Sequence, residues 1–195
     1  MWILQHWMRT AFRLLPSSNG YKEQVIHRFG SGGIYPETGL TFGPGGNLFG
    51  TTSFGGKGKC SIPPPSALFG CRVIFELLPQ GGDYHEKVIY SFTKMQAEKG
   101  IWPASPLTVG SDASMYGTTL EGGDPACDPS PSGAGGCGTV YRLAPSGAVD
   151  VLFQFRGGKY GSEPAAPLFY FHGALYGETL ADGTNGYGTT FKLHL

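Results

Sequence analysis

The run Lys87-Val88-Ile89-Tyr90-Ser91-Phe92 decides how this chain of 195 residues is organised, because it recurs at a fixed distance. Its counterparts are Gln24–Phe29 and Asp150–Phe155, so the phenylalanine that closes each run returns after 63 residues. Each run mixes β-branched and aromatic residues and is bounded by Gly, Pro or Asn, which is typical of a β-strand. The sequence therefore predicts a tandem repeat.

Three other strand-like blocks follow each run in the same order. The first is a short apolar run at Gly39–Phe42, Pro106–Val109 and Pro167–Tyr170. The second has an aromatic residue followed by Gly, at Asn47–Thr52, Ser114–Thr119 and Ala174–Thr179, and a tight hairpin is expected before it. The third is Val73–Pro79, Thr139–Pro145 and Thr189–Leu193.

These blocks predict one all-β repeat domain over residues 10–195, after an N-terminal extension at 1–9. We expect a partial unit at 10–23 and units at 24–86, 87–149 and 150–195. Four antiparallel strands per unit indicate β-propeller-like blades. Residues 10–16 match the third block and predict an orphan N-terminal strand. Because propellers have about 4 to 8 blades, three units predict an incomplete ring, or one that an oligomer completes.

Composition excludes several classes of partner. The 14 basic residues balance the 14 acidic ones, which argues against nucleic acid as a ligand. No apolar run approaches the roughly 20 residues that cross a bilayer. Residues 1–9 lack the features of a signal peptide. With 13% aromatic residues, the chain has enough apolar surface to fold.

The second unit, residues 87–148, carries a family resemblance. Its Val-Ile-Tyr-Ser-Phe, Pro-Leu, Met-Tyr-Gly-Thr-Thr and Gly-Thr-Val-Tyr-Arg-Leu segments stand in the order of the GloVer-type tandem repeat of bacterial extracellular proteins. The chain resembles this family over residues 10–195, although Glu178 stands where the family has Thr. The resemblance implies a secreted or surface-displayed repeat protein and implies no reaction.

The four cysteines occupy two equivalent positions in the first two units. This spacing predicts the disulfides Cys60–Cys71 and Cys127–Cys137, each closing one long loop, and hence an oxidising compartment. Two alternatives remain open. The first is a zinc site built from all four cysteines, although intervals of 11 and 10 residues are unlike those of common zinc sites. The second is that the cysteines are free thiols. We expect an extracellular or cell-surface location.

Candidate binding residues are sought where the repeats disagree. Tyr35, Trp102 and Glu163 each precede an equivalent proline, yet they differ in chemistry. Two aromatic rings and a carboxylate at one end of the units suit a sugar or another flat polar ligand. The structural alternative is that the aromatic side chains cover sheet edges.

Three functions compete. The leading hypothesis is a non-enzymatic extracellular module whose loops bind a glycan or protein ligand. A carbohydrate-active hydrolase is the second, for which only Glu163, Glu178 and Asp182 come into question as the paired carboxylates that glycosidases need. A truncated remnant of a longer array is the third. The histidines have no ligand spacing, so we expect neither a metal nor a cofactor.

Overall fold

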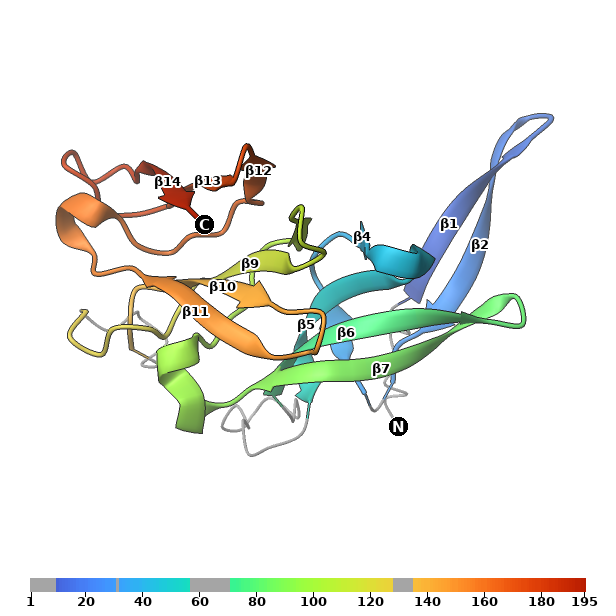
Figure 1. The fold of residues 1–195 in the computed structure, drawn as a ribbon. Helices are drawn as coiled ribbons and strands as arrows, with labels where there is room; N and C mark the ends of the chain where they lie inside the picture. The colour runs from blue at the N-terminus through green and yellow to red at the C-terminus, as the bar shows by residue number, and fades with distance from the viewer. Residues whose placement is uncertain (1–9, 31, 57–70, 128–134) are drawn as a thin grey trace, which may run out of the picture.

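The computed structural model describes residues 10–30, 32–56, 71–127 and 135–195, and these are all-β (Figure 1). No α-helix occurs among them, only 3-10 turns at Pro44–Gly46, Lys94–Lys99 and Gly158–Tyr160. In this part of the chain, no helix is long and apolar enough to cross a membrane. The four sheets follow one another in sequence order, and the described residues do not close into a ring.

Every strand pair in these sheets is antiparallel. The first sheet is a hairpin of β1 (Thr10–Ser17) and β2 (Gly20–Arg28). The second contains β3 (Ile34–Pro36), β4 (Thr41–Phe42), β5 (Leu48–Gly56), β6 (Cys71–Gln80) and β7 (Asp83–Phe92). The third contains β8 (Thr108–Val109), β9 (Met115–Thr119), β10 (Thr139–Leu143) and β11 (Val149–Gln154). The fourth contains β12 (Phe169–Phe171), β13 (Ala174–Glu178) and β14 (Thr190–His194).

The sheets do not begin where the sequence units were expected to begin. The recurring run at 87–92 lies in β7 and pairs with β6, so it closes the second sheet instead of opening the third. A two-residue turn explains this grouping, because Gly81 and Gly82 both have positive φ and match the twist of a tight hairpin. For the same reason, the strand expected to be an orphan, β1, pairs with β2. The sheets are therefore offset by one strand from the units expected at 24–86 and 87–149.

The antiparallel pairing gives the sheets two distinct ends. Short turns lie at one, including 43–47, 81–82, 110–114 and 144–148, and we call it the turn end. The hairpin that was expected before the aromatic-Gly block is confirmed there, between β4 and β5. The longer connections leave from the other, the loop end. Residues 35, 102 and 163 all belong to loop-end segments.

One aromatic contact joins each sheet to the next. Phe29 lies edge-on to Phe75 with ring centroids 5.0 Å apart. The equivalent pairs are Phe92–Tyr141 at 5.4 Å and Phe155–Phe191 at 5.2 Å. Phe75 and Tyr141 are fully buried, and each contact belongs to a separate apolar core between consecutive sheets. The 63-residue period of the phenylalanine is thus the period of the contact between sheets.

The glycine of each aromatic-Gly block makes room for the same ring. Gly50 pairs across the ladder with Phe75, Gly117 with Tyr141, and Gly177 with Phe191. A Cβ on Gly117 would lie 2.6 Å from Tyr141 Cζ, and one on Gly50 would lie 2.6 Å from Phe75 Cζ. Such distances are too short for real Cβ atoms, so the ring requires glycine beneath it.

A threonine hydroxyl adds a second link between sheets. Thr41 on β4 donates to the carbonyl of Leu107 at 2.6 Å, just before β8. Thr108 on β8 donates in the same way to the carbonyl of Leu168 at 2.5 Å, just before β12. The second and third sheets, and the third and fourth, are therefore linked at β4 and β8 as well as in their cores.

A polar pair replaces an apolar one between the first two sheets. His27 contacts the Tyr84 carbonyl through Nδ1 at 3.1 Å and Glu86 Oε2 through Nε2 at 3.2 Å. The repeat counterparts of His27 and Glu86 are Tyr90 and Val149, which belong to the apolar core between the second and third sheets. Burial raises the pKa of Glu86, and the hydrogen bond with His27 opposes that rise.

Gly117→Ala tests the requirement for glycine beneath the ring. The added methyl must displace Tyr141 from a closely packed core, and we expect a loss of about 1–3 kcal/mol in the free energy of unfolding. Urea titration measures this loss. Gly30→Ala is the matched control, because a Cβ there meets nothing within 4 Å. Equal stability of the two variants would contradict the account.

The double variant His27→Tyr/Glu86→Val tests the polar pair, because it installs the side chains of the next interface. In the wild type, the raised pKa of Glu86 gives stability that is present below the ordinary carboxyl pKa and lost as pH rises through the raised pKa. The double variant is expected to lack this decline and to be at least as stable at pH 7.

His27→Tyr alone leaves the Glu86 carboxylate buried without its partner, at a cost of about 1–3 kcal/mol. Urea titrations from pH 4 to 7 on the three proteins measure both effects. A double variant that is less stable than His27→Tyr would show that the side chains of the next interface cannot replace the polar pair here.

Candidate ligand-binding site at the loop end

The three predicted binding residues occupy equivalent backbone positions. Tyr35 lies in β3, and the residues on either side of it pair with β5. The carbonyl of Trp102 accepts from Leu120 N at 2.7 Å, and that of Glu163 accepts from Leu180 N at 3.1 Å. Each residue is thus held beside the loop end of β5, β9 or β13. Tyr35 and Glu163 have φ values of 64° and 58°, a conformation that costs energy in residues other than glycine.

Tyr35 and Trp102 are joined through two further side chains. The Tyr35 ring lies edge-on to Phe54, with centroids 5.9 Å apart. The guanidinium carbon of Arg72 lies 5.9 Å from the Phe54 ring centroid and 4.2 Å from that of Trp102. We call these four residues the Arg72 row. It crosses from the second sheet to the loop that enters the third.

The charge of the Arg72 row is partly buried. Desolvation lowers the pKa of Arg72 from its usual value, and the carboxylates of Glu121 and Glu37 oppose this shift. Arg72 Nε is buried without a hydrogen-bond partner among the described residues. A buried donor that makes no hydrogen bond costs about 1–3 kcal/mol. The row therefore combines a planar cation with aromatic faces, and two carboxylates lie close enough to act on its charge.

Glu163 lies at the next interface, in different surroundings. Its backbone N donates to the carbonyl of Cys137 at 3.0 Å. Gly138, the repeat counterpart of Arg72, packs against Pro164, and a Cβ there would lie 2.6 Å from Pro164 Cδ. The Arg72 row thus contains two of the three predicted residues, whereas Glu163 stands over a glycine.

Sequence reasoning missed Arg72 and Phe54. A signal was present, because the counterparts of Arg72 are Gly138 and Gly188, and those of Phe54 are Glu121 and Ala181. The repeats differ at these positions as well as at the residues before proline. A comparison of the repeats at every position points to the same cluster.

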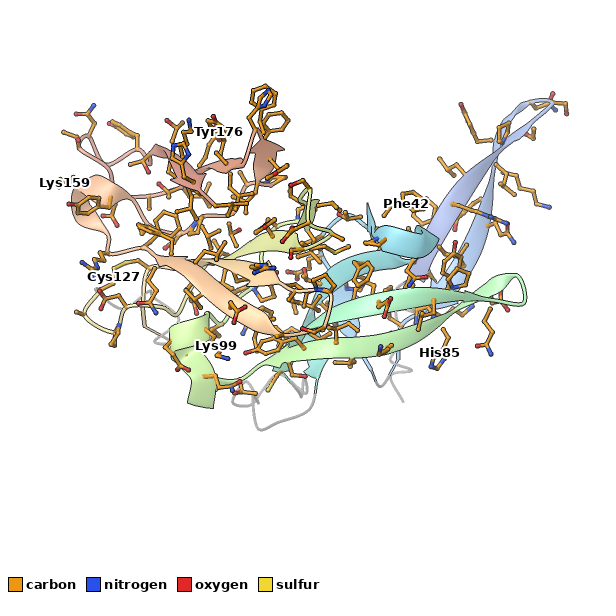
Figure 2. All side chains as sticks on the ribbon, viewed as in Figure 1. Phe42, His85, Lys99, Cys127, Lys159 and Tyr176 are labelled. Atoms are coloured by element: carbon orange, nitrogen blue, oxygen red, sulfur yellow. A yellow bond between two sulfur atoms is a disulfide. The ribbon has the colours of Figure 1, made fainter. Side chains whose placement is uncertain are left out.

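The cysteines agree with the predicted disulfide framework where the structure describes them. Cys127, labelled in Figure 2, forms a disulfide with Cys137, and their Cα atoms are 5.8 Å apart. Both lie buried in the core between the third and fourth sheets. The disulfide excludes a zinc site and free thiols for this pair. Cys71 is also disulfide-bonded. Its predicted partner, Cys60, lies outside the described residues.

The carboxylates considered for hydrolysis lie in separate surroundings. Glu178 is exposed at the end of β13 and borders a hollow on the outer face of the fourth sheet, with Phe169 and Tyr176. Asp182 lies in a loop beside Gly157, with its Oδ2 3.1 Å from the position of an added Cβ. Within the described ranges, no group of three or more His, Cys, Asp or Glu residues could hold a metal ion.

Comparison with known families finds a match to a repeat family. Residues 10–195 match the family model described as the Gloeobacter/Verrucomicrobia repeat, which confirms the resemblance to the GloVer-type repeat. No curated protein matches the chain.

Peptide mapping under non-reducing conditions tests the disulfide framework. Mass spectrometry after proteolysis is expected to link Cys127 to Cys137 and Cys60 to Cys71. Cys127→Ala/Cys137→Ala is expected to lose about 2–3 kcal/mol, because the bond closes a loop of 10 residues. A link between cysteines of different loops would overturn the assignment.

Proposed function

We propose that this chain, which belongs to the Gloeobacter/Verrucomicrobia repeat family, is a non-enzymatic extracellular repeat module that binds a glycan at its loop end. The observation that carries the proposal is the Arg72 row. Its residues come from separate segments of two sheets and place the two aromatic side chains singled out by the sequence on either side of a guanidinium.

The chemistry of the row suits a sugar. A pyranose presents a flat patch of C–H groups, which stack on aromatic faces, and a rim of hydroxyls, which need donors and acceptors. Trp102 supplies a partly exposed indole ring. The partly exposed guanidinium of Arg72 supplies N–H donors, and the exposed carboxylate of Glu37 supplies an acceptor close to it.

Two further parts of the proposal concern location and assembly. The disulfide between Cys127 and Cys137 supports an oxidising compartment outside the cell. Sheets that pack face to face with their loops at one end support a propeller-like arrangement. Phe169 is exposed at the position where Thr41 and Thr108 bond to a following sheet. A further repeat or a second copy would cover it.

Trp102→Ala tests the glycan site. A glycan array identifies a binding sugar, and calorimetry compares the wild type with the variant. We expect binding to weaken by about 1–3 kcal/mol, as for an aromatic anchor, with the melting temperature nearly unchanged. Tyr21→Ala is the control, because Tyr21 is an exposed aromatic residue at the turn of the β1–β2 hairpin.

Two results would contradict the proposal. Unfolding of Trp102→Ala, but not of Tyr21→Ala, would place Trp102 in the core and reject it as a binding residue. Release of reducing ends from the bound polysaccharide, measured in the same samples, would show that the module is an enzyme.

A further inference from the structure

A second site lies at the turn end, opposite the Arg72 row. A pocket of about 210 Å³ opens between the second and third sheets. Phe49, Ile89, Met115 and Leu143 supply apolar walls, and Glu76 and Lys87 line the pocket with charge. A cavity of about 150 Å³ is enough to hold benzene. This pocket therefore has room for one substituted aromatic ring.

On the charged side of the pocket, the two carboxylate oxygens of Glu76 differ in their contacts. Glu76 Oε1 accepts from Asn47 Nδ2 at 2.6 Å. Glu76 Oε2 lies 3.6 Å from Lys87 Nζ, whose side chain is 60% exposed, whereas the side chain of Glu76 is 11% exposed. Among the described residues, Oε2 of this nearly buried side chain thus contacts only an exposed ammonium, at 3.6 Å. A group that donates to Oε2 and accepts from Nζ would complete both.

The next interface shows what fits in such a place. There the ring of Tyr170 stacks on Tyr116, with centroids 6.4 Å apart and planes 2° from parallel. The Tyr170 hydroxyl hydrogen-bonds with Ser111 Oγ at 2.7 Å. In the repeat alignment, Tyr116 corresponds to Phe49 and Tyr170 corresponds to Val109.

Val109 is placed to leave the pocket open. It pairs with Met115 across the β8–β9 ladder, as Tyr170 pairs with Leu175 across the β12–β13 ladder. Directly paired residues have side chains on one face of a sheet, so the side chain of Val109 shares the face of Met115. Where one interface has a phenol ring, the other has only an isopropyl group, on a residue that pairs with the pocket-lining Met115.

We propose that this pocket binds a phenolic ring of a ligand. The ring packs on Phe49 as Tyr170 packs on Tyr116. The ligand hydroxyl donates to Glu76 Oε2 and accepts from Lys87 Nζ. This site is separate from the glycan site at the loop end, and neither depends on the other.

Binding of p-cresol, with toluene as the comparison, tests the proposal. Protein-observed NMR follows the methyl signals of Met115 and Ile89 during titration of the whole chain. We expect saturable shifts with p-cresol and at least 10-fold weaker binding of toluene. A parallel titration with N-acetyltyrosinamide distinguishes two sources of the ring. If the pocket takes a free phenol, p-cresol binds and N-acetyltyrosinamide does not. If it takes the tyrosine side chain of a peptide, both compounds bind equally well.

Val109→Tyr is the decisive variant, because it supplies the ring from within the chain. We expect it to abolish p-cresol binding while the melting temperature is kept, and Val109→Ile is the matched control that still binds. Glu76→Gln gives an independent readout, because p-cresol should then bind no better than toluene. Undiminished binding to folded Val109→Tyr, or equal binding of p-cresol and toluene to the wild type, would overturn the proposal.

Discussion

The fold depends on one packing constraint. In the second, third and fourth sheets, an aromatic ring on β6, β10 or β14 lies over a glycine of the paired strand β5, β9 or β13. The ring is held on its other side by the phenylalanine that closes the preceding sheet, with ring centroids 5.0–5.4 Å apart in all three cases. Edge-to-face pairs of this kind contribute about 0.5–1.5 kcal/mol beyond the area they bury. The ring thus connects a ladder contact within one sheet to the core between two. A Cβ on the glycine would break the first contact, and a smaller closing residue would weaken the second.

Both proposed sites lie where one unit differs from its neighbours at a position that the contacts between sheets do not require. Arg72 stands where the other units have Gly138 and Gly188, and it occupies the space against Trp102 at the loop end. Val109 stands where the fourth sheet has Tyr170, and it pairs with Met115, which lines the pocket at the turn end. One substitution adds a group and the other removes one. In a repeat protein, the neighbouring unit supplies the reference from which each departure can be judged.

The sequence predicted the all-β class, the period, the strand-like blocks and the disulfide between Cys127 and Cys137. These follow from local patterns and from recurrence, which need no knowledge of distant contacts. The grouping of strands into sheets was wrong, because the repeat period has no intrinsic starting point. The turn at Gly81 and Gly82 decides it, since both residues adopt positive φ and close a hairpin.

Part of the candidate site was equally beyond sequence reasoning. The equivalence of Tyr35, Trp102 and Glu163 follows from the alignment, yet the alignment does not say that Arg72 lies between the first two. That contact depends on how the second sheet meets the loop that enters the third, and long-range packing of this kind leaves no periodic signal. The polar substitution of His27 and Glu86 for an aromatic and an aliphatic residue is visible in the alignment, but their pairing across two sheets is not.

Hydrogen exchange on Phe92→Ala tests most directly whether the ring contacts couple the sheets. Phe92 lies on β7 of the second sheet, and its partner Tyr141 lies on β10 of the third. If the contact couples them, amides of β9 and β10 will lose protection together with those of β6 and β7, while the β1–β2 hairpin is less affected. A loss of protection confined to β6 and β7 would show that each sheet is stable by itself, and would contradict the account.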